Sequence, residues 1–238
     1  MVIDPSMKIP EVESFNNISI QSPVRSTYHL PAIHSSDSMY NNFEETSGII
    51  LMGSAASVHD SFKWIKDIQI IIKKAIKRKI PILGICFGHQ FIAHIFGGAV
   101  DYLWSKSKKK GVRRVKIFEN NSLIPRTEDL LIYSHQEGVV SCPPNFQVSA
   151  SSGMVEIEGL VHKNLPIWTF QPHVESSKEF ADRLGISSQQ FTKTIPCSSL
   201  ILSSFLNKLK NSENEKSNSL AIHSFFLNLL TVPTIIYK

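Results

Sequence analysis

The chain has 238 residues, of which 42% are hydrophobic, so it is long enough to bury one substantial core. Its formal charge of +5 comes from basic residues that are dispersed except in the run 106–114, a weak indication of nucleic-acid binding, so no nucleic-acid partner is expected. Three widely spaced cysteines match neither a disulfide framework nor a zinc site and favour a reducing compartment. Residues 1–30 lack the apolar stretch of a signal peptide, so we expect a cytoplasmic protein.

Two short apolar runs, Gly48 to Met52 and Ile80 to Ile85, predict buried strands of a parallel sheet. Between them, isoleucines recur at helical spacing with lysines off that stripe, which predicts a strand, helix, strand unit. The second strand leads directly into Cys86, and residues 89–96 predict a helix that ends at a pair of glycines. Cys86 is therefore expected at a strand-to-helix turn.

Several later segments predict further strands and a closing helix. The predicted strands are 112–118, 130–133, 146–150, 155–161 and 166–171; helices are expected at 175–184 and near 200–209. Residues 211–219 are polar and of low complexity, which predicts a domain over 1–210 and a linker with an apolar tail over 211–238. Polar residues and a proline interrupt the apolar segment 220–237, so we expect a packed or disordered tail and no membrane span.

The segment around Cys86, Gly-Ile-Cys-Phe-Gly, has a glycine two residues to either side of the cysteine, as in nucleophile elbows. A sharp turn needs small neighbours where the backbone packs closely, and it projects the sulfur toward a substrate. The start of a helix also favours the thiolate through its N–H groups and dipole. The pentapeptide alone is equally compatible with an inert core cysteine, so a second signal is required.

His173-Val-Glu175 supplies that second signal, because a cysteine nucleophile needs a base and the base needs an orienting group. This pair follows the predicted strand 166–171, and open α/β sheets place their sites at the carboxyl ends of strands. An isolated His-x-Glu is usually a surface pair. Its occurrence together with the elbow favours a catalytic interpretation.

Other histidines and acidic residues carry less weight. His89 and His94 lie on the predicted helix after Cys86 but lack a third ligand at suitable spacing, so no metal is expected. His59 and Asp60 favour a loop or helix-cap role over a second acid–base pair.

The remaining thiols and the basic run are also given non-catalytic interpretations. Cys142 and Cys197 are interpreted as inert. The basic residues at 106–110, together with Arg113 and Arg114, are interpreted as a solvated connection before the next strand.

These segments resemble the motifs of one enzyme family. Residues 81–90 resemble the Gly-x-Cys-x-Gly-x-Gln signature of class I glutamine amidotransferase domains, and residues 170–175 resemble their Gln-Phe-His-Pro-Glu segment. Residues 50–60 are similar to the glycine loop of the family, and 133–137 to its Ser-His-x-Asp segment. The likeness is strongest to stand-alone domains similar to the amidotransferase part of GMP synthase. It implies a flavodoxin-like α/β fold with three layers, a mostly parallel sheet flanked by helices.

The resemblance also implies roles for individual residues. Cys86 would attack the amide carbon of glutamine, His173 would move protons, and Glu175 would orient the imidazole. An oxyanion hole would be formed by backbone N–H groups of Phe87 and of the loop at Gly53 and Ser54, and the glutamine would be seated by Gln90, Ser134 and His135. No cofactor is implied.

The sequence departs from the family pattern at its start, where only residues 1–4 remain of a complete first strand. The fold is therefore expected to lack a complete first strand, with residues 17–20 as the segment that could compensate. The glycine loop reads Gly53-Ser-Ala instead of Gly-Gly-Pro, and Pro172 and Val174 alter the surroundings of His173.

Three functions remain open at this point. The first is a glutaminase that releases ammonia to a separate synthase, since the chain contains neither a pyrophosphatase loop nor a phosphate loop for acceptor chemistry. The second is a γ-glutamyl peptidase or hydrolase that acts alone with the same residues. The third is a catalytically silent binding module, which the short start and the unusual tail suggest.

Overall fold

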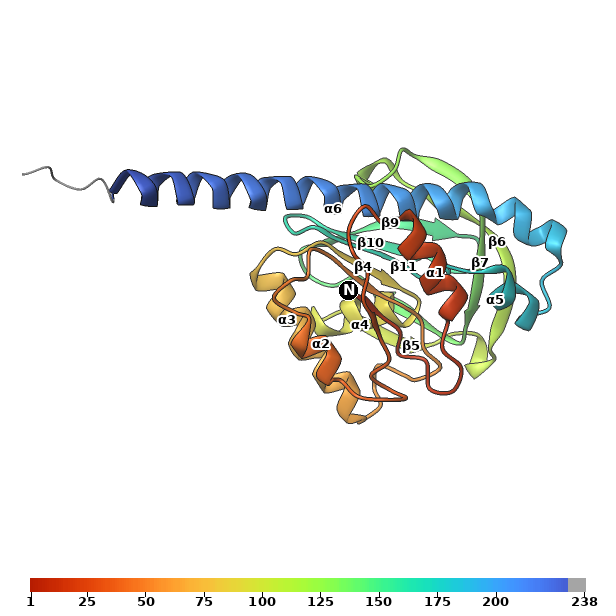
Figure 1. Cartoon of the computed structure of the whole chain (residues 1–238). Coiled ribbons are helices and arrows are strands. Elements are labelled where there is room, and N and C mark those ends of the chain that lie inside the picture. Colours follow the sequence, from red (N-terminus) through yellow and green to blue (C-terminus); the bar gives the residue numbers. More distant parts are fainter. Residues whose placement is uncertain (231–238) are drawn as a thin grey trace, which may run out of the picture.

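The computed structural model describes the backbone of residues 1–230 and the side chains of residues 1–209 (Figure 1). The strands of this part of the chain are β1 (Val2–Ile3), β2 (Tyr28–His29), β3 (Ile49–Leu51), β4 (Ile82–Ile85), β5 (Ala99–Tyr102), β6 (Lys109–Ile117), β7 (Thr127–His135), β8 (Glu137–Ser141), β9 (Phe146–Ser152), β10 (Gly159–His162) and β11 (Ile167–Phe170). The helices are α1 (Val12–Gln21), α2 (Asp37–Asn41), α3 (Lys63–Lys77), α4 (Phe87–Ile95), α5 (Lys178–Arg183) and α6 (Ser188–Leu230), with short 3-10 turns at 104–106 and 119–121.

Within residues 1–230, nine strands form one mixed sheet in the order β2-β1-β3-β4-β11-β10-β9-β6-β7, and β5 pairs with β8 separately. The neighbours from β2 to β11 are parallel, and those from β11 to β7 are antiparallel. β4 and β11 lie side by side and point the same way. The segments that follow them, which contain Cys86 and His173, therefore leave the sheet at the same edge.

Helices cover both faces of the sheet and give three layers (Figure 1). Successive residues of the short parallel strands alternate between two separate cores: Ile49 and Leu51 pack with α2, α3 and α4, whereas Ile50 packs with α1 and α6. Because both faces are covered, these strands are apolar at every position. This two-sided burial explains the uninterrupted hydrophobic runs in the sequence.

The first strand is present, although it is only two residues long. Val2 and Ile3 pair in parallel with β2 on one side and with β3 on the other. The expectation that residues 17–20 compensate for a missing strand is wrong, because they lie within helix α1. β1 therefore joins β2 to the rest of the sheet, and Tyr28–His29 supply the neighbouring strand.

The other predicted elements overlap observed ones, from the unit β3, α3, β4 to strand β11 and helix α5. Helix α6 continues from Ser188 to Leu230, so residues 211–219, where composition predicts a linker, have helical backbone. The division of the chain after residue 210 stays a prediction, and part of the predicted tail, 231–238, lies outside the described residues. None of the helices in the described residues has a stretch long and apolar enough to span a membrane.

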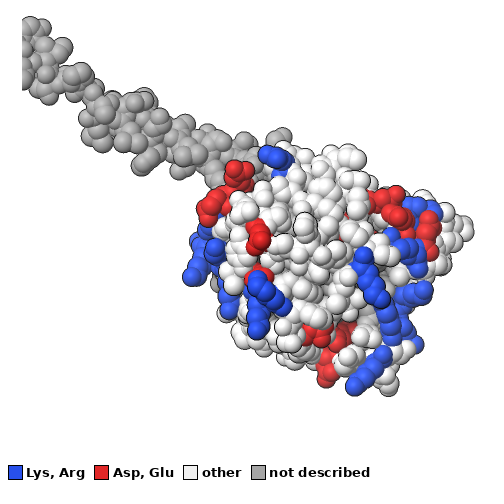
Figure 2. Space-filling view, turned by 60° about the horizontal axis from the view of Figure 1, so that its bottom comes forward, with Lys and Arg blue, Asp and Glu red and all other residues white. Residues whose placement is uncertain are grey.

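On the face shown in Figure 2, Lys and Arg side chains form separate groups, several of them beside Asp and Glu, and much of the surface between these groups is uncharged. The basic run of the sequence is divided by strand β6, in which Lys109 and Lys110 are exposed but Arg113 is buried. The interpretation of that whole run as a solvated connection is thus wrong for Arg113.

Candidate active site

Cys86 lies at the sharp turn between β4 and α4, as the glycine spacing predicts. Its φ of 53° and ψ of −102° lie in a region that a non-glycine residue rarely adopts, at a cost of about 1–3 kcal/mol. Its backbone N–H donates to the carbonyl of Phe170 at 2.9 Å, which ties the turn to β11. Backbone strain that is held in place in this manner is typical of active sites.

The two glycines around Cys86 are required by close packing. A Cβ at Gly84 would lie 2.7 Å from the carbonyl oxygen of Gly88, and a Cβ at Gly88 would lie 2.1 Å from that of Leu51. Helix α4 therefore approaches β3 and β4 more closely than any side chain would permit. This approach brings the N-terminus of α4 to the sulfur of Cys86.

His173 and Glu175 follow β11 and form a buried pair. Nδ1 of His173 lies 2.9 Å from Oε1 of Glu175, and the two residues are 6% and 5% exposed. The backbone N–H of His173 donates to Ile132 in β7 at 2.8 Å, and its ring packs against Phe180 with centroids 4.6 Å apart. These contacts fix the ring from the sheet on one side and from α5 on the other.

The electrostatic environment of His173 favours its protonated form. Burial lowers the pKa of His173, but the charges and hydrogen bonds of Cys86 and Glu175 outweigh burial and raise the pKa well above its ordinary value. The imidazole therefore interacts with the sulfur and with the carboxylate together. This arrangement is suited to a thiolate paired with an imidazolium.

The loop after β3 lies against both groups. A Cβ at Gly53 would be 2.8 Å from Cε1 of His173 and 3.4 Å from Cβ of Cys86, so only glycine fits there without displacement. Ser54 donates through its hydroxyl to the carbonyl of Pro5 at 2.7 Å, which anchors the loop to the N-terminal segment. Phe87 is the first residue of α4, and its N–H has no acceptor within the helix. The three predicted oxyanion-hole residues thus adjoin Cys86 in sequence or in space.

Two cavities meet at Cys86. The smaller, of about 170 Å³, is lined by polar residues that include Gln90, Ser134, His135 and Glu137. The Nε2 of Gln90 donates to the carbonyl of Glu137 at 2.7 Å and to Oε1 of Gln171 at 3.1 Å. The Glu137 carboxylate accepts from the Ser57 hydroxyl at 2.9 Å. Sequence reasoning quoted Glu137 in a motif without giving it a role, although it is the acidic residue of this cavity.

His135 is predicted to seat the substrate, but its ring is buried and engaged within the protein. Nδ1 lies 2.8 Å from the carbonyl of Glu137, and Nε2 lies 2.7 Å from a guanidinium nitrogen of Arg113. Burial, followed by the charge of Arg113, lowers the pKa of His135 to about 3, so the ring is neutral, with Nδ1 the donor and Nε2 the acceptor. His135 thus connects the wall of the small cavity to the core.

Sequence reasoning missed the ion pair behind this wall. Arg113 and Glu158 are 6% and 0% exposed and form a two-pronged pair, with N–O distances of 2.7 and 2.8 Å. Arg113 also lies over the ring of Tyr133 at 4.1 Å. One signal was present, because Arg113 is in phase with the buried Val115 and Ile117 of an alternating strand.

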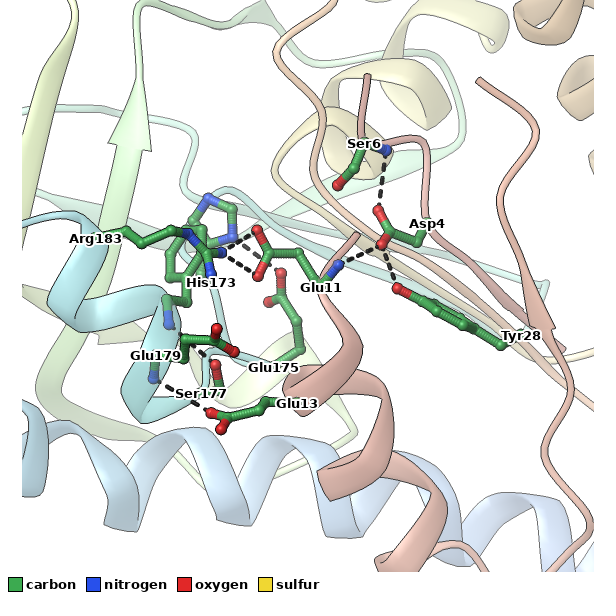
Figure 3. A network of polar contacts seen from close by, with 11 residues as sticks. Asp4, Ser6, Glu11, Glu13, Tyr28, His173, Glu175, Ser177, Glu179 and Arg183 are labelled. Atoms are coloured by element: carbon green, nitrogen blue, oxygen red, sulfur yellow. Dashed lines mark hydrogen bonds and ion pairs between the residues drawn. The ribbon is translucent and has the colours of Figure 1, made fainter. Parts of the chain in front are cut away.

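The larger cavity, of about 450 Å³, adjoins the same sulfur on the side of His173 and Glu175. Part of its wall is an ion pair between Glu11 and Arg183, with both N–O distances 2.5 Å, which Figure 3 shows beside the His173–Glu175 pair. Sequence reasoning missed this pair because its members are 172 positions apart. Burial raises the pKa of Glu11, and the charge of Arg183 opposes that change.

Among residues with described side chains, no group of three or more His, Cys, Asp or Glu is arranged to hold a metal ion. His89 is fully buried, with Nδ1 2.7 Å from the hydroxyl of Thr169. Asp60 accepts from the backbone N–H of Ser57 at 2.9 Å, a loop-closing role of the kind that the sequence favours. His59 lies 3.0 Å from the carbonyl of Val100 through its ring Nε2.

Comparison with known proteins identifies the family. The family model described as glutamine amidotransferase class-I matches residues 12–188. The chain belongs to this family. The match covers both β4–Cys86 and the His173–Glu175 segment.

Among the relatives of this class I glutamine amidotransferase is a subunit of the glutamine-hydrolyzing GMP synthase from Methanococcus aeolicus, which is 34% identical over 137 residues, 56% of this chain and 67% of the relative. A Thermoplasma acidophilum protein described as belonging to a GMP synthase superimposes with a TM-score of 0.70 and 20% identity over 91% of this chain and 96% of the other. A glutamine amidotransferase of Methylobacillus flagellatus gives 0.67 and 17% over 89% and 94%. These structural matches establish the α/β fold.

Proposed function

We propose that this chain hydrolyses the side-chain amide of glutamine through a thioester on Cys86. The observation that carries the proposal is the placement of Cys86, at a strained turn and a helix N-terminus, against the buried His173–Glu175 pair. Membership in a family of glutamine amidotransferases supports glutamine as the substrate.

In the proposed reaction, the Cys86 thiolate attacks the amide carbon, and the tetrahedral oxyanion is held by backbone N–H groups at Phe87 and at Gly53 or Ser54. Loss of one such donor costs about 3 kcal/mol of the barrier in comparable enzymes. The C–N bond then breaks as the His173 imidazolium gives its proton to the departing ammonia. Neutral His173 next takes a proton from water, which attacks the thioester and releases glutamate. Glu175 holds the imidazole in orientation throughout.

The small cavity is proposed to hold the amino-acid end of glutamine. Its buried carboxylate, Glu137, is complementary to the α-ammonium group, because a charged acceptor that is removed from water binds a cation strongly. Gln90 and the backbone at Ser134 line the same cavity, and His135 acts by holding the carbonyl of Glu137 in place.

Replacing Glu137 with Gln is expected to raise KM for glutamine about 10- to 100-fold, since a hydrogen bond to a charged group contributes about 1.5–3 kcal/mol. The hydroxyl of Ser57 retains an acceptor, so kcat should change less than KM. Steady-state kinetics tests this, with the exposed Glu156→Gln as the matched control. An unchanged KM would remove Glu137 from the substrate site.

Relatives that are named as one of the subunits of a glutamine-hydrolysing GMP synthase support a role for the chain as the ammonia-releasing member of a pair. We therefore propose that its partner is a separate synthase, which would carry out the acceptor chemistry.

Labelling with a glutamine-analogue electrophile, diazo-oxonorleucine, tests the proposed function. Mass spectrometry should find one label per chain at Cys86, no label in Cys86→Ala, and much slower labelling in His173→Ala, because the thiolate loses its imidazolium partner. If iodoacetamide modifies Cys86 but the analogue does not, the chain is a silent member of the family and the proposed function is wrong.

A further inference from the structure

The two cavities at Cys86 differ in their relation to the proton donor. His173 and Glu175 line the larger cavity, whereas the smaller one is lined by Gln90 and Glu137. The departing nitrogen must receive its proton from His173. A glutamyl group seated in the small cavity would therefore direct its departing amine into the large one.

The large cavity exceeds what a departing ammonia needs. Its volume of about 450 Å³ compares with roughly 30 Å³ for a water-sized molecule. Cavities of this size hold whole organic ligands and are lined mainly by apolar groups with a few polar ones. Here the apolar lining comes from the side chains of Met7, Ile9, Phe180 and Leu184.

The wall that carries Met7 and Ile9 is held in a fixed conformation. The fully buried Asp4 accepts from the backbone N–H groups of Ser6 at 2.9 Å and Glu11 at 2.8 Å, which anchors both ends of the segment (Figure 3). The Glu11–Arg183 pair joins this wall to α5, which supplies the opposite side. The cavity is therefore formed before any ligand enters it.

The charges of this cavity favour a carboxylate on the departing amine. Glu11 pairs with Arg183, and Glu175 pairs with His173, so the two acidic residues of the lining are both engaged. Two exposed lysines, Lys8 and Lys108, also line the cavity, and Lys108 lies where it meets the smaller one. The lining thus combines apolar surface with positive charge.

We propose that this chain also cleaves γ-glutamyl peptides in which a large apolar residue follows the γ-glutamyl group. The peptide nitrogen replaces the amide nitrogen of glutamine: Cys86 attacks the γ-carbonyl carbon, the C–N bond breaks, and His173 protonates the departing amino acid. Water then hydrolyses the thioester to glutamate. The apolar side chain of the leaving group packs near Met7 and Ile9, and its carboxylate faces the lysines. The inference rests on the thioester chemistry of the proposed function.

The test compares kcat/KM for glutamine, γ-glutamyl-leucine, γ-glutamyl-glycine and γ-glutamyl-lysine, with released glutamate as the readout. The full chain is expected to cleave γ-glutamyl-leucine about tenfold better than γ-glutamyl-glycine, in line with the value of apolar contacts in specificity pockets, and γ-glutamyl-lysine least. The double variant Met7→Ser/Ile9→Ser should lower the ratio of γ-glutamyl-leucine to glutamine about fivefold, because it removes partly exposed apolar contacts. Ile20→Ser, 83% exposed on α1, is the matched control and should leave the ratio within about twofold.

The outcomes separate this inference from the proposed function. Hydrolysis of glutamine without cleavage of γ-glutamyl-leucine would overturn the inference and leave the proposed function standing. Equal rates for the leucine, glycine and lysine peptides would also overturn it, since the cavity would then contribute no selectivity. Absence of glutamine hydrolysis and of labelling at Cys86 would mean that the proposed function itself had failed.

Discussion

Replacing Glu175 with Gln should lower kcat/KM for glutamine by about a thousand- to ten-thousand-fold, the range found when the orienting carboxylate of a catalytic triad is removed. The amide of Gln fits the same space, so the effect comes from lost charge and altered tautomer preference and not from lost packing. The 2.9 Å contact with Nδ1 of His173 is the interaction that changes.

The pH profile gives this prediction its sign. Cys86 and Glu175 raise the pKa of His173, so the imidazolium persists to a higher pH than an ordinary histidine would allow. Without the Glu175 charge the pKa of His173 falls, and the alkaline limb of the kcat/KM profile should move to lower pH. Glu179→Gln, an exposed change on α5, serves as the control. A loss of less than about tenfold, or an alkaline limb that stays in place, would show that Glu175 does not act on His173.

Replacing Arg113 with Leu is expected to lower the free energy of unfolding by about 3–5 kcal/mol, because it leaves Glu158 buried without its ionic partner. Glu158 is 0% exposed, and apart from Arg113 its carboxylate accepts from the hydroxyl of Ser152 at 2.5 Å. Urea denaturation at pH 7 measures the change. A loss below about 1 kcal/mol would mean that the ion pair is not essential to the fold.

Two comparisons separate charge from packing at this position. The double variant Arg113→Leu/Glu158→Leu should recover much of the stability, because it removes both buried charges together. Burial raises the pKa of Glu158, so its ionised form becomes unfavourable in the folded state as the pH rises from about 4.3 through the raised value. The defect of the single variant should therefore shrink as the pH is lowered and Glu158 takes up a proton.

The wall of the substrate cavity depends on the same pair. Arg113 contacts His135, whose Nδ1 lies beside the carbonyl of Glu137, and that carbonyl also accepts from Gln90. A buried network therefore extends from an ion pair in the core to the small cavity. In such a network, removal of one member leaves others unsatisfied, so its effect exceeds that of a single contact.

Local patterns were sufficient for the centre of the site. The glycines at 84 and 88 are dictated by close backbone approach around one turn, and His173 and Glu175 are two residues apart. The strand, helix, strand unit also follows from spacing over a few residues. In each case the physical requirement lies within a short segment, so its sequence alone carries the information.

Tertiary structure decided the features that join distant segments. Residues 17–20 form a helix, while the two-residue strand β1 is held between β2 and β3, because burial and sheet hydrogen bonds outweigh local preference. The Glu11–Arg183 pair and the cavity that it bounds arise from segments at opposite ends of the domain. Sequence by itself determined the reactive group and its base. The space around them, which selects the substrate, was determined only when the packed sheet brought these segments together, since hydrophobic periodicity does not specify which charged side chains will meet.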